Sequence, residues 1–236
     1  MNSGFNNGAD GPFDSSAMGA TSVANSPVEV RLNFIRKTYV LFMAGILMAI
    51  VGGVVSLNTS LWMIVLKTAP WSFLSLLLFT MVASALVRVP GLNYAALFGF
   101  TFITGIIFAP VVLIYERSAP GIATQAAFLT AIVFGALTAY AFISRRDFSF
   151  LRGMLFVGVI ALVVGGLANL FFFKSSAMAY WSAWVTLLLF SGFVLYDTSR
   201  IIHRYDEDGY CAAALELFLD FFNMFLAILR ILGGRR

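Results

Sequence analysis

Seven long apolar stretches constrain the fold of this chain more than any other feature. A membrane-spanning helix needs about 20 mostly apolar residues. Runs near that length follow one another along the chain: Tyr39–Leu57, Trp71–Val87, Leu92–Tyr115, Gly121–Ile143, Phe150–Phe173, Met178–Ile202 and Ala212–Leu232. Such continuous runs lack the alternation of membrane β-strands. We therefore predict an all-α membrane protein, a bundle of seven transmembrane helices joined by short loops.

The composition agrees with a membrane location. Of the 236 residues, 61% are apolar and 11% are charged, whereas an ordinary soluble domain carries about 25% charged residues. The chain has one Cys and one His, which excludes a disulfide framework and a multi-ligand Cys/His zinc site. The lipid bilayer is thus the first partner that the sequence predicts.

The first 27 residues differ from the rest. They are rich in Asn, Gly, Ser and Ala, and their only charged side chains are Asp10 and Asp14. No basic segment leads into an apolar one, so the pattern does not indicate a cleaved signal peptide. We predict a disordered tail over residues 1–27 and a seven-helix transmembrane domain over residues 28–236.

The distribution of Lys and Arg predicts the orientation. With seven spans, nine basic residues lie on the N-terminal side, and the opposite loops hold three, Lys67, Arg117 and Lys174. The nine are Arg31, Arg36, Lys37, Arg88, Arg145, Arg146, Arg152, Arg200 and Arg204. The excess favours a cytoplasmic N-terminus. Most of these basic residues flank helices, where the orientation of the chain and contact with anionic lipid headgroups account for the net charge of +4. We therefore expect no nucleic-acid partner.

The seventh run contains Glu216, Asp220 and Asn223, which makes a lipid-facing position unfavourable. We therefore expect this acidic helix to lie in the centre of the bundle. A re-entrant hairpin or an interfacial helix is the alternative. It gains some support from Arg230, Arg235 and Arg236, which fall outside the cytoplasm if the run spans the membrane.

Three acidic residues, Asp197, Glu216 and Asp220, fall within the apolar runs. Asp197 lies about six residues, or ~9 Å, before the end of the sixth run, and Asp220 about eight residues, or ~12 Å, into the seventh. In an antiparallel pair the two carboxyl groups would lie at nearly equal depth. Glu216 is one helical turn from Asp220 and shares its face.

Two carboxylates in contact away from water cannot both ionise easily, so the pair would share a proton and respond to pH. Carboxylate oxygens also suit Ca²⁺, which would compete with protons for Asp197 and Asp220. Arg88, near the end of the second run, could instead neutralise the pair and close a pore. A purely structural role, in which the acids hydrogen-bond neighbouring helices, is the alternative.

These residues carry a family resemblance. Gly192-Phe193-Val194-Leu195-Tyr196-Asp197-Thr198-Ser199-Arg200 near the end of the sixth run, and Glu216-Leu217-Phe218-Leu219-Asp220-Phe221-Phe222-Asn223 in the seventh, resemble the Bax inhibitor 1 family, also called the transmembrane Bax inhibitor motif family. Arg146-Asp147-Phe148-Ser149 is similar to bacterial members. The resemblance covers about residues 30 to 236.

The resemblance implies a seven-helix bundle with a central last helix and a pH-sensitive Ca²⁺ leak gated by a di-aspartyl sensor, which would map to Asp197 and Asp220. It also implies that an arginine of the second helix can latch onto the pair, and Arg88 is the basic residue there. Glu216 lies outside the core motif and would be auxiliary. A bacterial member would lie in the inner membrane.

Two other functions remain open. Some bacterial family members are described as modulators of a membrane AAA protease, so a non-conducting protein that binds a partner is the main alternative. An intramembrane aspartyl protease would also place a Tyr-Asp pair, here Tyr196-Asp197, on one helix and an Asp on the next. That class requires Gly-x-Gly-Asp, whereas Phe218-Leu219 precede Asp220, so we expect no enzyme and no bound cofactor.

Overall fold

The computed structural model describes residues 26–69, 71–206 and 208–234, and this part of the chain is helical without a β-strand. The tail predicted over residues 1–27 lies almost wholly outside the described residues. The helices are α1 (Val28–Asn58), α2 (Leu61–Thr68), α3 (Trp71–Leu86), α4 (Asn93–Ser118), α5 (Ile122–Ser144), α6 (Arg152–Ala168), α7 (Ser176–His203) and α8 (Tyr210–Gly233). A 3₁₀ turn, Ser149–Leu151, precedes α6, and a π turn, Asn169–Phe173, follows it.

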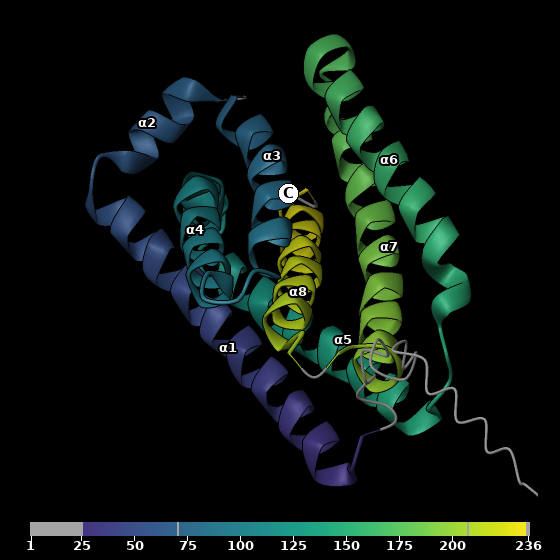
Figure 1. Cartoon of the computed structure of the whole chain (residues 1–236). Helices are drawn as coiled ribbons and strands as arrows, with labels where there is room; N and C mark the ends of the chain where they lie inside the picture. Colours follow the sequence, from purple (N-terminus) through teal and green to yellow (C-terminus); the bar gives the residue numbers. More distant parts are fainter. Residues whose placement is uncertain (1–25, 70, 207, 235–236) are drawn as a thin grey trace, which may run out of the picture.

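The last helix, α8, occupies the centre of the bundle, with α1, α4, α5 and α7 packed around it (Figure 1). In its most apolar stretch 61% of the residues are buried, against 6% in the outermost segment, Ser149–Phe173. The helix is continuous over 24 residues. The predicted central position is confirmed, and the hairpin and interfacial alternatives for this run are wrong.

Six helices in the described part are each long and apolar enough to cross a membrane. The second predicted run is different, because α3 has only 16 residues and rises roughly 24 Å. The preceding helix α2, which the sequence reading missed, meets α3 at a bend of 98°, and the two together bring the number of candidate spans to seven.

The first helix is longer than the apolar run that predicted it. The run begins at Tyr39, whereas α1 begins at Val28 and rises roughly 46 Å over 31 residues. The added turns carry Arg31, Arg36 and Lys37. Their long side chains can extend along the helix to water, so the helix continues beyond the segment that apolar residues alone mark.

Helices α1 and α4 are packed backbone to backbone at two glycines. A Cβ on Gly52 would collide with the carbonyl oxygen of Phe102, and a Cβ on Gly105 would collide with that of Ala49. The Ser56 hydroxyl donates to the carbonyl oxygen of Ile106 over 3.1 Å in the same interface. Small residues let membrane helices approach closely in this way.

Helices α6 and α7 form a pair on one side of α8, and α3 lies on the opposite side of α8 (Figure 1). Side-chain caps fix the ends of neighbouring helices. The Glu116 carboxylate accepts the backbone N–H groups of Gly121 and Ala123 at the start of α5, and the Ser175 hydroxyl accepts the N–H of Met178 in α7. The ends of α3, α5 and α7 and the starts of α6 and α8 lie toward the other end of the bundle.

Candidate functional site

Asp197 of α7 and Asp220 of α8 come together in the interior of the bundle. Their residues are 5% and 3% exposed, and the two carboxyl groups line the same cavity, close enough to act on each other. Two carboxyl groups that approach each other away from water do not both ionise easily, so such a pair can share one proton. The structure therefore has the face-to-face arrangement that the matched depths of the two residues predicted.

Apolar packing on both helices holds the acid pair in place. Val194 and Ile201 flank Asp197 on α7, and Leu217 and Met224 flank Asp220 on α8, and all four are almost fully buried. The second oxygen of Asp220, Oδ2, has no hydrogen-bond partner within the described residues. A buried carboxyl oxygen without a protein partner is available to a proton, a water or a cation.

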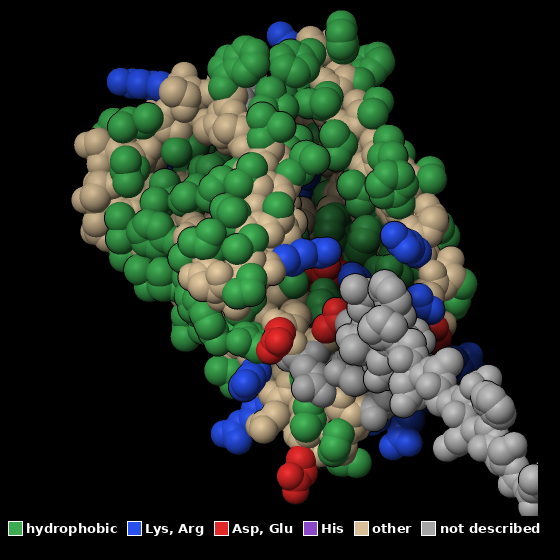
Figure 2. Space-filling model, viewed as in Figure 1, with side chains coloured by type: hydrophobic (Ala, Val, Ile, Leu, Met, Phe, Trp, Pro, Cys, Tyr) green, Lys and Arg blue, Asp and Glu red, His purple; other side chains and the backbone are tan. Residues whose placement is uncertain are grey.

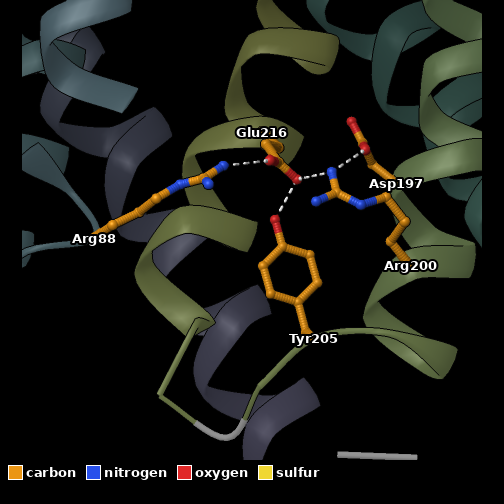
Figure 3. A network of polar contacts seen from close by, with 5 residues as sticks. All are labelled: Arg88, Asp197, Arg200, Tyr205 and Glu216. Carbon is orange, nitrogen blue, oxygen red and sulfur yellow. Dashed lines mark hydrogen bonds and ion pairs between the residues drawn. The ribbon is translucent and has the colours of Figure 1, made fainter. Parts of the chain in front are cut away.

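Arg200 links the acid pair to Glu216, a connection that the sequence reading missed. One guanidinium nitrogen, Nη1, donates to Asp197 Oδ1 over 3.2 Å and to Glu216 Oε2 over 2.8 Å (Figure 3). The arginine lies three residues after Asp197, so the two side chains share a face of α7. That spacing was visible in the sequence, but Arg200 was counted only among the charges at the N-terminal side.

Tyr205, in the connection between α7 and α8, completes the network. Its hydroxyl donates to Glu216 Oε2, the same oxygen that Arg200 contacts. Burial raises the pKa of the Tyr205 hydroxyl, and the charge of Glu216 raises it further, so the hydroxyl stays protonated. The Arg200 guanidinium also lies over the rings of Tyr196 and Tyr205, 5.5 and 5.0 Å from their centroids.

Arg88 lies just beyond the end of α3 and reaches Glu216 rather than the aspartates. Its Nη2 is 3.9 Å from Glu216 Oε1, and its side chain is 65% exposed (Figure 3). The contact of Arg88 with the site thus runs through Glu216. In this arrangement Arg200 makes the direct contact with Asp197 that the latch hypothesis assigned to Arg88.

A cavity of about 550 Å³ opens beside the acid pair, between α3, α4, α6, α7 and α8. Its walls are mostly Phe, Leu and Val side chains, and its polar groups include Asp197, Asp220, Arg200, Glu216 and Asn223. The Asn223 amide nitrogen donates to the Leu219 carbonyl oxygen, which leaves the amide oxygen as a further possible ligand.

Two further cavities adjoin this one. A cavity of about 890 Å³ lies at the end of the bundle where α7 ends and α8 begins, and it shares Val159, Phe193, Tyr196, Arg200 and Glu216 with the first. A cavity of about 810 Å³ extends toward the other end and shares Phe73, Phe108, Leu162 and Leu226 with it. The acid pair therefore lies beside a series of adjoining cavities that runs along α8.

The residues present do not form a closed calcium-binding cage. Ca²⁺ takes six to eight oxygen ligands, and the described residues contain no cluster of three or more Asp, Glu, His or Cys side chains arranged for a metal ion. Asp197 and Asp220 supply at most four carboxylate oxygens, and the Arg200 guanidinium is beside them. A Ca²⁺ ion at this pair would therefore need further oxygen ligands, such as water.

The fold and the site together define a class, an integral membrane protein built as a helical bundle, with six to seven candidate spans in the described residues and a central last helix that carries one half of a buried acid pair. The comparisons give the family. The family model described as "Inhibitor of apoptosis-promoting Bax1" matches residues 31–236. The chain belongs to this Bax inhibitor 1 family, as the motifs around Asp197 and Asp220 predicted.

Relatives come from distant organisms. The "Bax inhibitor 1" of Schizosaccharomyces pombe is 34% identical over 90% of this chain and 80% of its own length. "Protein lifeguard 4" of Mus musculus is 31% identical over 89% of this chain and 88% of its own. An "uncharacterized membrane protein" of Vibrio cholerae is 38% identical over 66% of this chain and 70% of its own.

Proposed function

We propose that this protein is a pH-sensitive Ca²⁺ leak whose gate is the pair Asp197 and Asp220. The observation that carries the proposal is the position of two buried carboxyl groups, from neighbouring helices, on the wall of one cavity. Apolar walls exclude most water, so the pair holds one proton readily, and a cation that enters competes with that proton. The resemblance to the family points to the same function.

The ion pairs around Arg200 correspond to a resting state. The guanidinium compensates the charges of Asp197 and Glu216 and lies where the 550 Å³ and 890 Å³ cavities adjoin. A positive charge at that place opposes the passage of a divalent cation. Opening then requires Arg200 to leave Asp197, and the protonation state of the acid pair biases that step.

The test is Ca²⁺ influx into proteoliposomes that contain the purified protein and a calcium dye, measured from acidic to alkaline pH. We expect a slow influx whose rate changes with pH in the wild type. Asp197→Asn and Asp220→Asn should change the rate and flatten its pH dependence, because each removes one of the two titrating groups.

Asp206→Asn is the matched control, since Asp206 is exposed in the α7–α8 connection and does not touch the acid pair. It should behave as the wild type. An influx that is absent at every pH would contradict the leak and favour the alternative, a non-conducting protein that modulates a membrane partner such as an AAA protease. An influx with an unchanged pH profile in both Asn variants would contradict the assigned gate.

We also propose that the acid pair is not a protease dyad. Helix α8 runs unbroken through Asp220, whereas an intramembrane aspartyl protease opens the helix at glycines beside the second aspartate so that a substrate backbone can enter. Incubation of the purified protein with a membrane-protein substrate tests this. Cleavage that an aspartyl-protease inhibitor blocks would overturn it.

A further inference from the structure

The 890 Å³ cavity at the α7–α8 end of the bundle has an unbalanced positive charge. Four arginines line it, Arg88, Arg152, Arg200 and Arg204, and they face a single carboxylate, Glu216. Figure 2 shows Lys and Arg side chains around the mouth of a hollow with hydrophobic walls and acidic side chains inside it. The acid pair accounts for Arg200, but neither the acid pair nor the proposed ion path accounts for the other three arginines.

The four guanidinium groups are not equally engaged. Arg200 is committed to Asp197 and Glu216. Arg204 forms an ion pair with Asp147 over 2.9 Å. Hydrogen bonds from Ser149, and a weaker contribution from Arg204, lower the pKa of Asp147 to about 2. This pair is therefore charged at neutral pH.

The other two arginines are available. Arg152 has no ion pair or side-chain hydrogen bond with any described residue, and the Arg88 contact with Glu216 is long and exposed. Arg88 and Arg152 can therefore turn toward an added anion at little cost, whereas Arg200 cannot.

The positions of these arginines place them at headgroup level. Arg88 follows the end of α3 at Leu86, Arg152 is the first residue of α6, and Arg204 follows the end of α7 at His203. Basic residues at the ends of spanning helices meet the phosphate layer of the bilayer. Phe156, Phe193 and Val159 line the same cavity, and Val159 and Phe193 continue into the apolar 550 Å³ cavity.

We propose that this cavity binds an anionic phospholipid, with its phosphate between Arg88 and Arg152 and an acyl chain that enters between α3 and α6. An arginine pair recognises phosphate through paired N–H donors, and the apolar cavity beyond it takes the chain, which a free phosphate could not use. The chain would occupy part of the proposed ion path, so bound lipid would oppose conduction. Lipid binding itself does not depend on that function.

The test measures binding of phosphatidylglycerol to the full-length protein in a neutral detergent, by native mass spectrometry and by the thermal midpoint during a lipid titration. We expect phosphatidylglycerol to bind and stabilise the protein more than phosphatidylcholine. Arg88→Gln and Arg152→Gln should each weaken binding about fivefold, the effect of one basic residue at an anionic headgroup. Val159→Trp should weaken it by blocking the entry of the chain.

Arg146→Gln is the control, because Arg146 is exposed at the same end of the bundle but does not line the cavity. It should leave binding unchanged. Equal binding of the two lipids, or an equal loss in Arg146→Gln and Arg152→Gln, would overturn the site. Stabilisation by glycerol phosphate alone that equals that by the lipid would identify a free-anion site and would overturn the lipid assignment. None of these outcomes depends on whether the protein conducts Ca²⁺.

Discussion

At the scale of single residues, Arg200 connects all the charged groups at the centre of the bundle. It contacts Asp197 on its own helix and Glu216 on the next, and Glu216 in turn receives Tyr205 and Arg88. Two carboxylates of α7 and α8 thereby share one guanidinium whose side chain is 26% exposed. Loss of Arg200 would leave Asp197 without its cationic partner and Glu216 with only the long contact to Arg88 and the hydrogen bond from Tyr205.

We predict that Arg200→Gln lowers the thermal midpoint of the detergent-solubilised protein by roughly 3–10 °C, since a hydrogen bond to a charged group contributes about 1.5–3 kcal/mol. Glu216→Gln should lower it as well. In the double variant the two effects should not add, because each single variant already removes the pair. Thermal unfolding of the wild type, the two single variants and the double variant gives this double-mutant cycle.

Arg117→Gln is the control for this cycle, because Arg117 is exposed near the far end of α4 and joins no ion pair among the described residues. Its midpoint should equal that of the wild type. Additive losses in the Arg200 and Glu216 double variant would show that the two side chains act independently, contrary to the geometry.

Sequence reasoning reached the acid pair but not the network around it. Helix rise and the positions of two chain breaks were enough to place Asp197 and Asp220 at one depth. The partner of Glu216 depends on which way Arg200 and Tyr205 turn, and that is set by the packing of α7 against α8. Arg88 was predicted near the acids because it ends the second run, but its reach stops at Glu216.

At the scale of the helices, the contact of α1 with α4 depends on the absence of two side chains. We predict that Gly105→Val destabilises the protein by roughly 1–3 kcal/mol, as overpacking of a tight interface does. The obstacle is the backbone of Ala49, which cannot change rotamer to make room. Thermal unfolding and the yield of folded protein measure the effect, and Gly52→Val should behave similarly.

Gly99→Ala is the control on the same helix, since a Cβ there would meet no atom within 4 Å. It should keep or slightly raise the thermal midpoint, because alanine favours a helix over glycine. If Gly105→Val were as stable as Gly99→Ala, the helices would not be packed as closely as Figure 1 and the glycine contacts indicate.

Apolar run length predicted the helical bundle and six of its spanning helices, but it predicted neither the ends of the helices nor the division of the second span into α2 and α3. A run marks where side chains are apolar, whereas a helix ends where its backbone hydrogen bonds stop. The polar turns of α1 before Tyr39 are therefore helical, and α2 is an extra helix in a segment read as a loop. The length of α3 and its 98° bend from α2 could not be read from the length of the apolar run.

At the scale of the whole molecule, the arginine-lined cavity and the acid pair lie one after the other along helices α7 and α8. The cavity with four arginines lies where α7 ends and α8 begins, and the acid pair lies deeper along the same helices. The nine basic residues counted for orientation include these four arginines. Four of the charges from which the orientation was predicted therefore also line this cavity.

The orientation itself can be tested with a thiol reagent that does not cross membranes. The only cysteine, Cys211, is 1% exposed, so the wild type should give little background. Ser118, the last residue of α4, and Arg146, just after the end of α5, are exposed near the two ends of α5. With the N-terminus in the cytoplasm, as the Lys and Arg excess predicts, Ser118→Cys should be labelled in intact cells, whereas Arg146→Cys should be labelled only after the membrane is permeabilised. The opposite pattern would reverse the orientation, and labelling of both in intact cells would mean that α5 does not cross the membrane.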